Sequence, residues 1–372
     1  PWWLRMTTNS QPSDPPGSIR ESFTTRLPGT NIWFVRTAVK LLEAGPQTAK
    51  YYVATNGNDS GAGTNIAQPF RTLYKVVSVA NPGDLIYVRG GNYQSNRVLT
   101  INRSGSAANP IRLRAYPGEH PVLDFSSQTF ASGNRGIQLQ ASWWHLYGFE
   151  VVGAGDNGLN ITGHSNVIEL CVFHDCRDTG LQITGPGSSN LVLNCDSYHN
   201  FDTVTHGENA DGFAPKLAGL GPKNVFRGCR AWENADDGWD MVAAPNAVLI
   251  ENCWSFLNGT NGVNDPSYAG DGNGFKLGGV DNGVPIAAPH RLVNCVSFGN
   301  THHGYDQNNN SAGQTLDQCT AWNNGTLSGL NFNLDHGTVT QGVHVVRNNL
   351  SFDGSDDFAT ANLTNNSWQL FI

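Results

Sequence analysis

A short pattern of cysteine, an aromatic residue and asparagine recurs between residues 171 and 354. Each full copy has Ser or Ala two positions after Cys, an aromatic residue at the third position and Asn at the fifth. The full copies are 195–200, 229–234, 253–258, 295–300 and 319–324, and 171–176 and 349–354 are altered copies. Successive copies start 24, 34, 24, 42, 24 and 30 residues apart, which indicates a unit of 24 residues with loops inserted into some copies.

A second pattern, Gly followed by an apolar or aromatic residue, recurs alongside the first. Its copies start at Gly136, Gly158, Gly180, Gly212, Gly238, Gly274, Gly304 and Gly329. Side chains alternate across a strand, so the residue after Gly points inward and the next one points outward. Short strands at a fixed repeat without helical periodicity predict an all-β parallel β-helix, a single-stranded solenoid of about ten coils of roughly 24 residues each.

Equivalent residues of stacked coils form ladders. We expect the aromatic residues and the seven cysteines inside the solenoid, with the cysteines as small buried apolar residues instead of a disulfide framework. The five repeated Asn residues are expected at a corner, where each amide bonds to the coils above and below.

The first 49 residues lack this pattern. We expect a poorly ordered tail over residues 1–49, in which 32–42 form a short amphipathic helix, and a β-helix domain over residues 50–372. Tyr51–Val53 and Leu85–Val88 predict strands. The chain begins at Pro1, so a signal peptide cannot be judged from its sequence.

Composition narrows the function classes. The chain has 43 Gly, 18 Pro, 14% charged residues and a formal net charge of -8, without a basic run. These features argue against a nucleic-acid partner. No apolar stretch approaches the roughly 20 residues that cross a bilayer, so we expect no membrane partner. We expect a monomer.

Four carboxylates gather on one outer face of the predicted solenoid. Equivalent residues of successive coils form a column along the solenoid. The column of residues directly before Gly contains Thr179, Asp211, Asp237, Asn273 and His303. The column of residues two positions after Gly contains Gln138, Asn160, Gln182, Ala214, Asp240, Lys276, Asp306 and Asn331. Asp211, Asp237 and Asp240 therefore lie on adjacent coils, with Asp236 beside them. Such a cluster predicts a Ca²⁺ site, whereas a lone Asp more often bonds to nearby backbone N–H groups of a turn.

Lys276 is expected next to Asp240 on the following coil. Its ordinary role would be that of a solvated surface lysine. Beside a bound dication its pKa would fall, which favours a general base that removes the proton next to a metal-bound carboxylate.

These segments resemble pectate lyases of polysaccharide lyase family 9. The resemblance is carried by the motifs Asp211-Gly212-Phe213, Asp236-Asp237-Gly238-Trp239-Asp240 and Gly270-Asp271-Gly272-Asn273-Gly274-Phe275-Lys276. It implies a right-handed β-helix and a calcium-dependent lyase that cleaves polygalacturonate by β-elimination. It also implies that Asp211, Asp236, Asp237 and Asp240 hold calcium and that Lys276 removes the C5 proton, which gives 4,5-unsaturated products. Secretion is inferred from the polymeric substrate.

Further residues on this face are candidates for sugar subsites: Lys216, Tyr268, Asn273, Tyr305, His302 and His303. Two other functions fit the same fold. An inverting polygalacturonase-like hydrolase would need two carboxyl groups roughly 6.5 to 9.5 Å apart and would leave Lys276 without a role. A non-catalytic carbohydrate-binding solenoid would use calcium only for stability.

Overall fold

The computed structural model describes residues 5–9, 18–26, 33–41, 47–281, 283–335, 342–358 and 361–369. The chain divides into two compact units, residues 1–48 and 49–372. Within the first unit, β1 (Arg5–Asn9), β2 (Ser18–Arg26) and β3 (Trp33–Leu41) form an antiparallel sheet. The predicted helix over residues 32–42 is therefore wrong. The β-branched and aromatic residues of this stretch favour a strand, and pairing with β2 satisfies its backbone.

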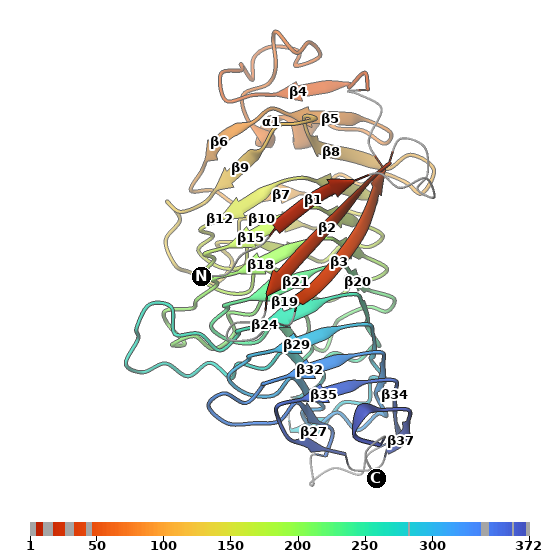
Figure 1. Ribbon diagram of the computed structural model, residues 1–372. Helices are drawn as coiled ribbons and strands as arrows, with labels where there is room; N and C mark the ends of the chain where they lie inside the picture. The colour runs from red at the N-terminus through yellow and green to blue at the C-terminus, as the bar shows by residue number, and fades with distance from the viewer. Residues whose placement is uncertain are drawn as a thin grey trace. The chain divides into compact units, whose positions relative to one another are not determined.

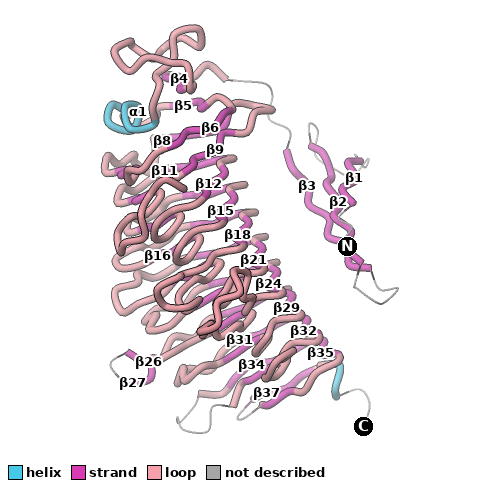
Figure 2. The backbone as a smooth tube through the Cα atoms, turned by 90° about the vertical axis from the view of Figure 1, so that its left-hand side faces the viewer, coloured by secondary structure: helices cyan, strands magenta, loops and turns pink. Residues whose placement is uncertain are grey.

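The second unit is a parallel β-helix of stacked coils (Figures 1 and 2). Three parallel sheets run along it, and most coils give one strand to each. Sheet 1 carries the predicted site. Its strands are β7 (Leu99–Ile101), β10 (Ile137–Leu139), β13 (Leu159–Ile161), β16 (Leu181–Ile183), β19 (Phe213–Pro215), β22 (Trp239–Asp240), β25 (Phe275–Lys276), β30 (Tyr305–Asp306), β33 (Phe332–Asn333) and β36 (Asp356–Asp357).

Sheets 2 and 3 complete each coil. Sheet 2 consists of β4 (Tyr51–Val53), β5 (Leu85–Val88), β8 (Ile111–Ala115), β11 (Trp144–Tyr147), β14 (Val167–Glu169), β17 (Leu191–Leu193), β20 (Val225–Arg227), β23 (Leu249–Glu251), β28 (Arg291–Val293), β31 (Thr315–Asp317), β34 (His344–Arg347) and β37 (Ala361–Thr364). Sheet 3 consists of β6 (Gly91–Gln94), β9 (Pro121–Asp124), β12 (Glu150–Val152), β15 (Val172–His174), β18 (Asp196–Tyr198), β21 (Arg230–Trp232), β24 (Trp254–Phe256), β29 (Val296–Phe298), β32 (Thr320–Trp322) and β35 (Leu350–Phe352). The strands predicted at 51–53 and 85–88 are confirmed.

Few other elements occur. Helix α1 (Leu73–Val79) begins after its N-cap Thr72, whose side chain accepts a hydrogen bond from the Lys75 backbone, and its apolar face packs at the N-terminal end of the solenoid. Among the described residues, the remaining elements are the hairpin of β26 (Val280–Asp281) and β27 (Val284–Pro285) and the 3₁₀ turn η1 (Ser367–Gln369). None of the helices in the described part of the chain has the length and apolar character that a membrane span requires.

The predicted ladders hold the coils together. All seven cysteines are buried, and none of them forms a disulfide. Each repeated Asn bonds to the next: the Asn200 side chain donates to Asn234 Oδ1 at 2.8 Å, and the Asn258 side chain donates to Asn300 Oδ1 at 3.0 Å. The residue after Gly forms the interior column of sheet 1 as far as Tyr305, and Phe332 continues it. Phe213, Trp239, Phe275, Tyr305 and Phe332 stack there with ring centroids 4.8 to 5.1 Å apart.

The aromatic residues three positions after each Cys are not in the interior, contrary to expectation. They lie at the ends of the sheet 3 strands and stack along its outer face; for example, the rings of Tyr198 and Trp232 are 4.5 Å apart. Cys occupies the corner before the strand, and the middle residue of the three-residue strand points inward. Ser197, Ala231 and Ser255 therefore fill the interior positions, each completely buried.

Candidate active site on sheet 1

The predicted carboxylates and Lys276 lie on three adjacent coils of sheet 1. Asp211 comes two residues before β19, and Asp237 comes two residues before β22. Asp236 precedes Asp237, and Asp240 ends β22. Asp240 pairs in register with Lys276 on β25, as the column predicted. The predicted column of residues two positions after Gly is confirmed as far as Asp306. Its last member is Asn333 and not Asn331, because Phe332 occupies the inward position next to Tyr305.

A chain of side-chain-to-backbone hydrogen bonds fixes the column that precedes each Gly. Asp211 Oδ1 accepts the Asp237 N–H at 3.3 Å, and Asp237 Oδ1 accepts the Asn273 N–H at 2.7 Å. Asn273 Oδ1 in turn accepts the His303 N–H at 3.1 Å. Each of these residues is therefore oriented by the next coil, and the predicted alignment of the column is confirmed.

The carboxylates form two overlapping groups that suit a cation. Asp211, Asp237 and Asp240 offer oxygens within 4.8 Å of one another, and so do Asp236, Asp237 and Asp271. Asp237 Oδ1 also accepts the Asn273 side-chain N–H at 2.9 Å, whereas the buried Oδ2 of Asp237 has no hydrogen bond. An all-oxygen set with one such buried carboxylate oxygen is the donor chemistry that Ca²⁺ prefers.

Two lysines are ion-paired with these carboxylates. Lys216 is buried, and its Nζ lies 2.8 Å from Asp211 Oδ2 and 3.0 Å from Asp240 Oδ2. Lys276 Nζ lies 3.2 Å from Asp237 Oδ2 and 2.6 Å from Asp271 Oδ2. Burial opposes the charge of Lys276, but the surrounding carboxylates outweigh it, and the pKa of Lys276 is raised well above its usual value. A bound dication would act in the opposite direction.

The carboxyl groups differ in how their charges are compensated. Burial raises the pKa of Asp211 and Asp237 well above the usual range, and it raises the pKa of Asp236 in the same direction. Burial also opposes ionisation of Asp240, but Lys216 and Lys276 outweigh it and hold the Asp240 pKa below its usual value. The two lysines do not compensate the whole cluster. A proton or a cation is needed to stabilise the other carboxylates.

The residues predicted for sugar subsites lie in different environments. The predicted sugar-binding role of Tyr305 is wrong, because Tyr305 is fully buried in the aromatic column and its hydroxyl donates a hydrogen bond to the Cys295 carbonyl at 2.9 Å. Asn273 is buried against Asp237, and Lys216 is occupied by its ion pairs. Tyr268 is half-buried in the loop before Asn273, and its hydroxyl donates to the Ala235 carbonyl at 2.5 Å.

His302 and His303 lie on the coil that follows the one with Lys276, and both are half-buried. Their rings are 4.0 Å apart, and His303 Nδ1 accepts the Leu330 N–H at 3.0 Å. Their role in sugar binding stays a prediction.

Sequence reasoning missed Asp271. It belongs to the loop inserted between the repeats at Cys253 and Cys295 and not to a column, so no repeat partner marks its position. Its backbone N–H donates to Asp236 Oδ1 at 2.7 Å, and its carboxylate contacts Lys276. Its place in the Gly-rich segment 270–274 was the available signal.

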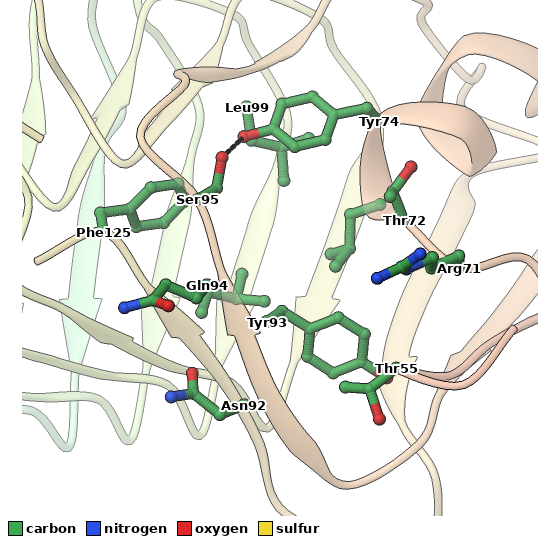
Figure 3. A pocket seen from close by; sticks show the side chains of 12 residues that line it. Thr55, Arg71, Thr72, Tyr74, Asn92, Tyr93, Gln94, Ser95, Leu99 and Phe125 are labelled. Atoms are coloured by element: carbon green, nitrogen blue, oxygen red, sulfur yellow. Dashed lines mark hydrogen bonds between the residues drawn. The ribbon is translucent and has the colours of Figure 1, made fainter. Parts of the chain in front are cut away.

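A separate pocket of about 310 Å³ lies between α1 and the first coils (Figure 3). Its lining includes Arg71, Tyr74, Asn92, Tyr93 and Gln94, and it contains no carboxylate and no histidine. It therefore offers neither a carboxylate ligand for a metal nor a carboxylate or imidazole base, and the cluster on sheet 1 remains the candidate active site.

Comparisons with known proteins agree with this geometry. Residues 51–349 match the family described as "Pel9A-like, right handed beta helix region". Pectate lyase L of Dickeya chrysanthemi is 40% identical over 326 residues, which are 86% of this chain and 74% of the relative. The crystal structure of pectate lyase Pel9A superposes with a TM-score of 0.79 at 39% identity, covering 86% of this chain and 79% of that one.

A rhamnogalacturonan lyase is also similar, with a TM-score of 0.75 and 31% identity over 86% of this chain and 87% of that one. The matches extend over the β-helix that carries the aspartates and Lys276, and they confirm the predicted right-handed fold. The chain therefore belongs to the Pel9A-like family of right-handed β-helix proteins.

Proposed function

We propose that the chain is a calcium-dependent pectate lyase that cleaves polygalacturonate by β-elimination. The observation that carries this proposal is the contact of Lys276 with Asp237 at 3.2 Å, inside a cluster of buried carboxylates whose charge two lysines do not balance. The names of its relatives, pectate lyase L and pectate lyase Pel9A, support the same activity.

Each residue of the cluster has one task in this reaction. Asp211, Asp236, Asp237 and Asp240 would hold calcium, which, when bound, neutralises the uronate carboxylate and makes the adjacent C–H more acidic. Lys276 Nζ takes the C5 proton in its neutral amine form, which a dication bound nearby would favour. The electrons of the C–H bond form the C4–C5 double bond, and the C4 glycosidic oxygen leaves with a proton from water. Lys216 helps to keep Asp240 ionised, and it orients the Asp211 and Asp240 carboxylates.

The hydrolase alternative is disfavoured by distance. Oxygens within each of the two carboxylate groups approach to within 4.8 Å, whereas an inverting hydrolase keeps its two carboxyl groups about 6.5 to 9.5 Å apart to admit water. The closely spaced carboxylates suit a shared cation better. The binding-module alternative predicts sugar binding without cleavage, which the assay below separates.

The test is the ultraviolet absorbance of unsaturated products from polygalacturonate, with calcium and with excess chelator. Calcium-dependent absorbance that Lys276→Met removes, and that the exposed-lysine control Lys223→Met retains, supports the proposal. New reducing ends without absorbance would mean hydrolysis, and binding alone would mean a carbohydrate-binding solenoid.

A parallel reaction with a rhamnogalacturonan backbone tests the other relative's substrate. The proposal expects faster cleavage of polygalacturonate. The polymeric substrate also leads us to propose that the protein works outside the cytoplasm.

A further inference from the structure

The Asp271 carboxylate is the closest polar partner of Lys276. The two charged groups are 2.6 Å apart, compared with 3.2 Å between Lys276 Nζ and Asp237 Oδ2. The Asp271 side chain is 52% exposed, whereas that of Lys276 is 14% exposed. Asp271 therefore lies on the solvent side of a largely buried ammonium group.

Calcium binding would weaken the other contact of Lys276. Asp237 Oδ1 accepts two N–H groups from Asn273, so Oδ2 is the oxygen available to a cation, and Oδ2 is also the atom that Lys276 contacts. A dication and an ammonium group at one oxygen repel each other. Asp271 is then the carboxylate that continues to hold the Lys276 side chain.

The backbone around Asp271 is fixed on both sides. Its own N–H donates to Asp236 Oδ1, and the Gly272 carbonyl accepts the His302 N–H at 3.0 Å. A Cβ atom at Gly270 would lie 2.1 Å from the Ala235 carbonyl oxygen, so this segment sits directly on the neighbouring coil. A carboxylate presented from such a backbone can hold a flexible lysine side chain in one place.

We infer that Asp271 is a positioning residue for Lys276, holding its Nζ where the C5 proton of the substrate is removed. The inference rests on the proposed lyase function. It assigns Asp271 no calcium-binding role, although its carboxylate lies near Asp236 and Asp237.

The test compares Asp271→Asn, Asp271→Glu and the control Asp265→Asn. Asp265 belongs to the same inserted loop and pairs with His206 at 2.9 Å, away from Lys276. The Asn variant keeps the backbone N–H that bonds Asp236, so the loop retains that anchor. Kinetics on polygalacturonate and the calcium concentration for half-maximal activity are measured for each protein.

We expect Asp271→Asn to lower kcat about ten- to hundredfold, the scale expected for a misplaced reacting group. KM and the calcium requirement should stay near those of the unmodified chain. Partial recovery in Asp271→Glu and full activity in Asp265→Asn would support positioning. Unchanged or higher kcat in Asp271→Asn would overturn the inference, and so would a loss explained by weaker calcium affinity. An inactive unmodified chain would instead refute the lyase function.

Discussion

Replacing Lys216 by Met should destabilise the protein strongly, because Lys216 lies between two buried carboxylates. Its side chain is 7% exposed, and its Nζ is 2.8 Å from Asp211 and 3.0 Å from Asp240. At an effective dielectric constant of about 20, each contact corresponds to roughly 6 kcal/mol of attraction, which the desolvation of three charges partly offsets. Met occupies a similar volume, so the substitution mainly removes charge.

Breaking a buried ion pair by removing one partner typically costs about 3 to 5 kcal/mol. For a chain of this length, about 2 °C per kcal/mol gives a fall in Tm of about 6 to 10 °C. Thermal unfolding followed by circular dichroism in excess chelator measures this effect. Calcium should reduce the deficit, since a cation can replace part of the missing charge.

The control is Lys223→Met, because Lys223 is exposed and lies outside the carboxylate cluster. If Lys216→Met and Lys223→Met unfold at the same temperature in chelator, the two ion pairs contribute no net stability. The account of how Asp240 stays ionised would then be wrong.

Three further predictions concern the ladders and sheet 3. Asn258→Ala removes the acceptor of two hydrogen bonds from Asn234, so urea unfolding should show a loss of about 3 kcal/mol, against little change for the exposed Asn362→Ala. Tyr305→Phe should cost about 1 kcal/mol of unfolding free energy while KM for polygalacturonate stays unchanged; a raised KM would restore its sugar-binding role. Burial opposes the charge of His174, but its carboxylate partners outweigh this and raise its pKa. The contribution of charged His174 to the unfolding free energy is therefore complete below the pKa of about 6.5 in the unfolded chain. It disappears as the pH rises through the higher pKa of His174 in the folded chain. The unfolding free energies of the unmodified chain and His174→Asn should therefore converge at alkaline pH, and a constant difference would contradict this.

The repeat predicts those features that each coil shares with its neighbours. A residue whose position recurs every 24 residues has its ladder partners fixed by the spacing, which is why the pairing of Asp240 with Lys276 followed from the sequence. The same reasoning failed where strand ends were uncertain. The three-residue strands of sheet 3 place the residue after the corner Cys outward, so the aromatic residue at the third position also faces outward.

Contacts of residues that do not recur from coil to coil could not be predicted from the repeat. Lys216 follows β19 and reaches back to Asp211, five residues earlier, and nothing in the repeat favours that direction over solvent. The sugar-binding prediction for Tyr305 failed for a different reason. Its position directly after Gly304 already assigned Tyr305 to the interior column, which is not open to a sugar.

Asp271 shows why the inserted loops matter most for the chemistry. The ladders set the spacing of the coils and can bring carboxylates together, but a strict repeat would present the same side chains on every coil. A single site needs a departure from the repeat, and the 42-residue interval between Cys253 and Cys295 supplies one beside Lys276. The loop in this interval contributes Tyr268, which contacts Ala235, and Asp271, which contacts Lys276. The ladders therefore fix where the site lies along the solenoid, and the inserted loop determines which carboxylate holds Lys276.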